Sequence, residues 1–148
     1  MYKKILVAID DSETSRSALK EALHIARTSN AKLYITHVAD ETMLNIHCHV
    51  MSGAVNLDSA VANLLQAGQK LLDGAMASAT GVNAEALMLE ASSRRISETI
   101  SEKAKELGVD LIIIGRHGQR GLATLLLGSV AEQLAKIADA SVLLVRKH

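Results

Sequence analysis

The 148-residue chain contains no phenylalanine, tryptophan or proline, and Tyr2 and Tyr34 are its only aromatic residues. Proteins that bind single-stranded nucleic acid stack the bases on aromatic side chains, so this composition argues against that class. Sixteen Lys and Arg balance sixteen Asp and Glu, which leaves no net charge to attract nucleic acid or an anionic membrane. Cys48 is the single cysteine and cannot form an internal disulfide bond, which favours a reducing compartment.

Long hydrophobic runs are absent as well. The first apolar run covers only residues 5–9 before two aspartates, which is too short for the core of a signal peptide. No stretch approaches the roughly 18 apolar residues that cross a bilayer. We therefore expect a cytoplasmic protein with neither a membrane nor a nucleic-acid partner. Its length and its 49% hydrophobic content predict one domain over residues 1–148, with an aliphatic core.

Short apolar runs alternate with stretches of helical period along the whole chain. Strands are predicted at residues 3–9, 33–38, 83–90, 109–114 and 141–145. Helices are predicted between them: one capped by Ser12 or Thr14, one over residues 57–76, one capped by Ser92 or Ser93, and one opened by Gly128 and Ser129. Residues 39–56 read as a long loop. Five strands alternating with four helices predict an α/β fold with an open, doubly wound parallel sheet, whose ligands bind beyond the carboxyl ends of the strands.

A glycine pattern follows the fourth predicted strand. Ile114 leads into Gly115-Arg116-His117-Gly118, and nine residues later come Gly128 and Ser129, which gives G-x2-G-x9-G-S. Glycines let successive N–H groups converge on an anion, and the start of a helix adds further unpaired N–H groups. The chain lacks both G-x-x-x-x-G-K-[ST] and G-x-G-x-x-G, which excludes a Walker loop and the dinucleotide fingerprint. A tight turn without a ligand is the alternative interpretation.

With this motif and its opening segment ILVAIDDSETS, the sequence resembles the universal stress protein family, in particular its ATP-binding branch. The segment DLIIIGRHGQRGLATLLLGSVAEQLAKIADASVLLVRK is similar to the C-terminal half of that family. The resemblance implies a single universal stress protein domain, a Rossmann-like sheet of the adenine nucleotide alpha hydrolase type and the strand order 3-2-1-4-5. It also implies a homodimer that pairs through residues 141–145.

The resemblance further implies an adenine nucleotide, namely ATP, ADP or AMP, with or without Mg²⁺. The glycines and Ser129 would hold the phosphates, Asp10 would face the ribose or adenine, and the Val38 backbone would bind the edge of the adenine. The full implied set is Ala8, Ile9, Asp10, Val38, Ile114, Gly115, Arg116, Gly118, Gly128, Ser129 and Val130. Asp10 and Asp11 could bind Mg²⁺ or simply form a turn, and both interpretations stay open.

Other residues carry weaker signals. His47, Cys48 and His49 are residue types that bind zinc or copper, but no fourth ligand is apparent and we do not predict a metal site. His37 is interpreted as a structural residue of its strand. Three functions stay in view: an ATP-binding regulatory or stress-response module, a slow ATPase or phosphotransferase, and a dimeric interaction protein that needs no nucleotide. Phosphoryl transfer requires a fixed arrangement of reacting groups, which the sequence does not supply, so we favour the binding module and predict no catalytic residue.

Overall fold

A computed structural model describes residues 1–42, 44, 57–117 and 127–147 of the chain. The elements in order are β1 (Lys4–Ala8), α1 (Glu13–Ser29), β2 (Lys32–Ala39), α3 (Leu57–Ala77), β3 (Ala84–Glu90), α4 (Ile96–Leu107), β4 (Leu111–Gly115), α5 (Ser129–Ile137) and β5 (Ser141–Val145). The strands form one parallel sheet in the order β3-β2-β1-β4-β5, which confirms the predicted fold class and strand order. The loop predicted over residues 39–56 lies mostly outside the described residues.

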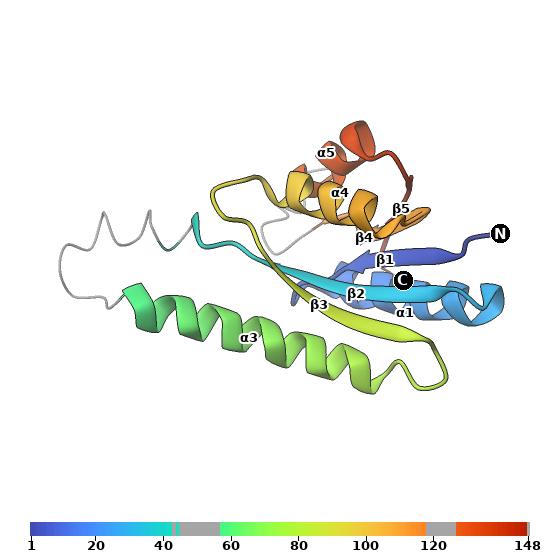
Figure 1. Ribbon diagram of the computed structural model, residues 1–148, viewed down its shortest axis with the longest axis horizontal. Helices are drawn as coiled ribbons and strands as arrows, with labels where there is room; N and C mark the ends of the chain where they lie inside the picture. The colour runs from blue at the N-terminus through green and yellow to red at the C-terminus, as the bar shows by residue number, and fades with distance from the viewer. Residues whose placement is uncertain (43, 45–56, 118–126, 148) are drawn as a thin grey trace.

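Two layers of helix cover the sheet, with α1 and α3 on one face and α4 and α5 on the other (Figure 1). The central strands are buried on both faces, so side chains alternate between two cores. Ile5 and Val7 pack under α1, whereas Leu6, Ile112 and Ile114 pack under α4 and α5. Each fully buried aliphatic side chain stabilises the fold by about 1.5–3 kcal/mol, which explains why unbroken aliphatic runs form these strands.

The start of α1 confirms one of its two predicted caps. Ser12 is the N-cap, and its hydroxyl oxygen accepts a hydrogen bond from the Ser15 N–H at 3.2 Å. Asn30 ends the helix in the left-handed conformation with a φ of 52°. No helix in the described ranges is long and apolar enough to cross a lipid bilayer.

The predicted cap of α4 is wrong. Arg95 is the N-cap residue and makes no side-chain capping bond, while Ser92 and Ser93 lie in the preceding turn with φ values of 50° and 69°. A capping residue has extended backbone angles, which these two left-handed serines lack. The turn closes instead through the Arg94 N–H, which donates to the Ala91 carbonyl at 2.9 Å.

Candidate functional site

The order of the sheet reverses at β1, because α1 leads to β2 on one side and α4 leads to β4 on the other. Ala8 lies in register with Thr36 of β2 and with Ile114 of β4, so the carboxyl ends of the three strands meet at one edge. In open α/β sheets this reversal point opens a crevice where ligands bind. The predicted site residues Ala8, Ile9, Asp10, Val38, Ile114 and Gly115 all come from this edge.

The turn from β1 into α1 fixes Asp10. Its main-chain N–H donates to the Ser15 hydroxyl oxygen at 2.8 Å, and its carboxylate Oδ1 accepts from the Ser12 N–H at 2.8 Å. The sequence left two roles open for Asp10, a turn or Mg²⁺ binding, and these bonds show that it forms the turn. A hollow of about 320 Å³ lies next to it, lined mainly by apolar side chains of α1 and α3 such as Leu19 and Leu71.

Gly115 allows β4 to approach the first turn of α1. A Cβ atom at this position would lie 2.6 Å from the Thr14 Oγ1 and 2.8 Å from the Thr14 carbonyl carbon. One residue past Arg116, the His117 carbonyl accepts hydrogen bonds from the Thr14 and Ser12 hydroxyls. The first glycine of the motif thus has a packing role that its spacing did not reveal, and Ser12 and Thr14 anchor the start of the glycine loop.

The start of α5 is tied to the same place. Gly128 is its N-cap residue with no side-chain capping bond, and the Gly128 N–H donates to the Arg116 carbonyl at 2.7 Å. This N–H is therefore not available to an anion. The next three N–H groups, of Ser129, Val130 and Ala131, have no partner inside the helix. The Ser129 side chain is exposed, whereas Val130 packs partly against the core.

The glycine loop itself is described only at its two ends. Gly118 lies outside the described residues, as do His47, Cys48 and His49. Within the described part of the loop, the buried Arg116 Nε and His117 Nδ1 atoms have no hydrogen-bond partner. No group of three or more His, Cys, Asp or Glu residues in the described ranges is arranged to hold a metal ion.

Val38 presents its main chain to the crevice. Lys32 and Thr36 bond towards β1, since the Lys32 N–H donates to the Lys3 carbonyl at 2.9 Å and the Ile9 N–H donates to the Thr36 carbonyl at 2.8 Å. Because directions alternate along a strand, the Val38 N–H and carbonyl also face β1. Register pairing between β1 and β2 ends at Ala8, so these groups extend past the paired part of β1.

Exposed ion pairs lie near the starts of the helices. Lys147 contacts Glu13 at 2.7 Å and lowers the pKa of that carboxyl, and Lys136 does the same to the pKa of Glu132 at 2.7 Å. Both carboxylates are therefore charged at neutral pH.

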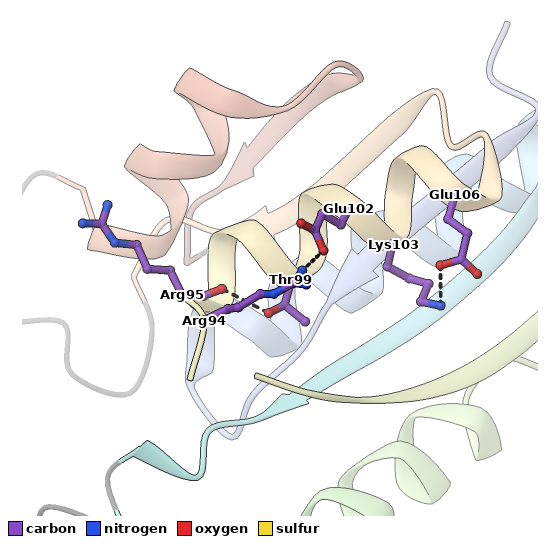
Figure 2. A network of polar contacts seen from close by, with 6 residues as sticks. All are labelled: Arg94, Arg95, Thr99, Glu102, Lys103 and Glu106. Carbon is purple, nitrogen blue, oxygen red and sulfur yellow. Dashed lines mark hydrogen bonds and ion pairs between the residues drawn. The ribbon is translucent and has the colours of Figure 1, made fainter. Parts of the chain in front are cut away.

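A second hollow of about 280 Å³ lies between the end of β3 and α4. Four of the five charged residues that line it form two ion pairs, Arg94 with Glu102 and Lys103 with Glu106, as Figure 2 shows, and the fifth is Glu90. On the same helix the Thr99 hydroxyl donates to the Arg95 carbonyl at 3.1 Å. Since acidic residues outnumber basic ones in this lining, the reversal point of the sheet stays the better candidate for an anionic ligand.

Comparison with known proteins identifies the family and agrees with the fold. The model of the universal stress protein family matches residues 1–146. Universal stress protein YxiE of Bacillus subtilis is 33% identical and covers 99% of this chain and 100% of its own length. The solved structure of MJ0577 from Methanocaldococcus jannaschii superposes with a TM-score of 0.84 at 27% identity, over 100% of this chain and 98% of that one. A universal stress protein solved in complex with cAMP is 26% identical, with a TM-score of 0.71 over 99% of both chains.

Proposed function

The chain belongs to the universal stress protein family, and from that membership we propose that it binds an adenine nucleotide and acts as a nucleotide-dependent regulatory module of the stress response. The start of α5 carries the proposal, because its first three N–H groups have no partner inside the helix and its helix dipole favours an anion at the carboxyl edge of the sheet. A relative solved with cAMP supports an adenine nucleotide as the ligand. We also propose that the protein is located in the cytoplasm.

In this proposal the phosphates lie at α5. The Ser129 and Val130 N–H groups and the Ser129 hydroxyl donate to them, and Arg116 and Gly118 contribute from the glycine loop. Gly128 shapes the turn, because its own N–H already bonds to Arg116.

The nucleoside part lies over β1 and β2. Asp10 faces the ribose, above Ala8, Ile9 and the neighbouring Ile114, and the main chain of Val38 binds the base. ATP, ADP and AMP share these contacts. Where Mg²⁺ accompanies the phosphates, Asp10 is the carboxylate proposed to bind it.

Ser129→Pro tests the phosphate contact directly. Proline is tolerated at the first helical position, and Gly128 already has a ψ of 151°, the extended value that a residue before proline needs. The variant deletes one N–H and the hydroxyl, whereas the control Ser129→Ala deletes only the hydroxyl. Hydrogen bonds to charged groups change affinity by roughly 10- to 100-fold, so we expect ATP affinity to fall that far in Ser129→Pro and less in Ser129→Ala.

The measurement is calorimetry on protein stripped of nucleotide, with ATP, AMP and GTP, each with and without Mg²⁺. Equal ATP affinity in wild type and Ser129→Pro would contradict the assignment of the phosphates to α5. Absence of binding to every nucleotide by the wild type would overturn the proposed function and leave the nucleotide-independent interaction module. Steady ATP turnover that disappears in Ser129→Pro would instead favour the enzyme.

We also propose a homodimer that pairs through β5. This strand lies at one edge of the sheet, where the main chain of an apolar strand is open to pairing with another copy. Val142→Lys should weaken the dimer in sedimentation experiments at several protein concentrations. An unchanged sedimenting mass in a variant whose circular dichroism matches the wild type would contradict the pairing.

A further inference from the structure

The pairing between β1 and β2 stops one rung earlier than the length of β2 would allow. The last rung is the bond from the Ile9 N–H to the Thr36 carbonyl at 2.8 Å. In a parallel ladder the next rung would join the Val38 N–H to the Ile9 carbonyl. In the described part of the chain that bond is not formed, although β2 continues to Ala39 beside β3.

The side chain of His37 takes the place of the missing rung. Its Nδ1 lies 2.8 Å from the Ile9 carbonyl oxygen. A carbonyl oxygen only accepts hydrogen bonds, so Nδ1 carries the hydrogen and donates it. The imidazole thus satisfies the Ile9 carbonyl that the Val38 N–H would otherwise reach.

The imidazole is also confined from the other side. Gly68 of α3 packs against it so closely that a Cβ atom there would lie 2.7 Å from the His37 Cδ2 and 3.2 Å from its Nε2. Gly68 is buried, and His37 is partly buried between α3 and the sheet. The ring therefore has a fixed position between a helix and a carbonyl, as a spacer requires.

We propose that His37 is a positioning residue that holds β1 and β2 apart beyond Ile9 and so keeps the Val38 N–H open to the base of the bound nucleotide. This inference rests on the proposed function, and it assigns to His37 a role that the sequence did not suggest. His37 does not touch the ligand. It acts by occupying the acceptor that would close the sheet over the base-binding edge.

Two variants distinguish the effect of the Nδ1–H donor from the effect of the imidazole ring itself. His37→Leu removes the Nδ1–H donor, whereas His37→Asn places an amide N–H close to the former Nδ1 position. Amide hydrogen exchange, followed by NMR on unliganded protein, reports the state of the Val38 N–H. We expect fast exchange in wild type and in His37→Asn, and exchange at least tenfold slower in His37→Leu, where Val38 can bond to Ile9.

Calorimetry with two ligands then tests the link to the base. We expect ATP to bind about tenfold more weakly to His37→Leu, with most of the affinity restored in His37→Asn, since one hydrogen bond is at stake. Inorganic tripolyphosphate, which has no base, should bind all three proteins equally. Unchanged Val38 exchange in His37→Leu, or an equal loss of tripolyphosphate binding, would overturn the inference.

Failure of the proposed function gives a different result. If the wild type binds neither ATP nor tripolyphosphate, the proposed function and the ligand part of this inference both fail. The exchange of the Val38 amide still decides whether His37 separates the strands. If His37→Leu does not fold, Gly68→Ala displaces the ring from the opposite side, and the same two measurements apply to it.

Discussion

Two glycines of α3 provide a matched test of how tightly the imidazole of His37 is held. Both lie inside the helix, where alanine is favoured over glycine by about 0.5–1 kcal/mol. A Cβ atom on Gly74 meets nothing within 4 Å, so Gly74→Ala should raise the free energy of unfolding by that amount. A Cβ atom on Gly68 lies 2.7 Å from His37 and 2.8 Å from the Met88 methyl.

The methyl end of Met88 can move at little cost, but the His37 ring is bonded to Ile9 at 2.8 Å. Inserting a methyl group into a packed site costs about 1–3 kcal/mol. Because the helix-propensity gain is common to both variants, the difference between them isolates the steric cost, and we expect Gly68→Ala to be less stable than Gly74→Ala by about 1–3 kcal/mol.

Urea unfolding, monitored by circular dichroism, measures both variants against the wild type. Equal slopes of unfolding free energy against urea concentration are needed, since they show that the same surface is exposed in each variant. If Gly68→Ala gains as much stability as Gly74→Ala, the ring moves freely and the account of His37 as a fixed spacer is refuted.

Three further substitutions test other parts of the structure. Ser93 has a φ of 69°, a conformation that costs a residue with a side chain about 1–2 kcal/mol; Ser93→Gly should therefore raise the stability in thermal unfolding by about 0.5–1 kcal/mol, while Ser93→Ala should not. Gly115→Ala should lower the urea-derived stability by about 1–3 kcal/mol, and removing the Thr14 hydroxyl as well should not restore it, because the backbone carbon of Thr14 at 2.8 Å remains in the way. Lys147 lowers the pKa of Glu13, so the pair stabilises the folded state above about pH 4 and this contribution is lost as the pH falls through the folded-state pKa. The stability difference between wild type and Glu13→Gln should then shrink between pH 7 and about pH 3, and a constant difference would show that the pair contributes nothing.

The strands could be predicted because parallel strands buried on both faces read as unbroken aliphatic runs. The residues of β5 coincide with the predicted 141–145, and β4 with its three consecutive isoleucines differs from its prediction by a few terminal residues. The order of the strands could not be predicted in the same way, because the residues of a strand do not determine which strands lie next to it in the sheet. That order came from the resemblance to a family, and the register pairs confirm it.

Long-range packing and one local turn explain what the sequence could not predict. Gly115 packs against Thr14, which lies about a hundred residues away along the chain. The spacing of Gly115 to the other glycines suggested a ligand and gave no sign of this contact. The two serines before α4 had the right composition for a cap, but the turn after β3 gives them left-handed backbone angles. His37 looked like an ordinary strand residue, because only the three-dimensional structure brings it against Ile9 and Gly68.

The central place of β1 affects how the chain folds during synthesis. One side of β1 pairs with β2, which follows after a single helix, but the other side pairs with β4, where Ile5 meets Leu111. At typical rates of synthesis β4 follows β1 by roughly 5–20 s. During that interval β3, β2 and β1 can assemble while the edge of β1 that later pairs with β4 stays unpaired. An unpaired edge of an aliphatic strand is prone to aggregation. Nascent chains that end before residue 111 should therefore depend most on chaperones.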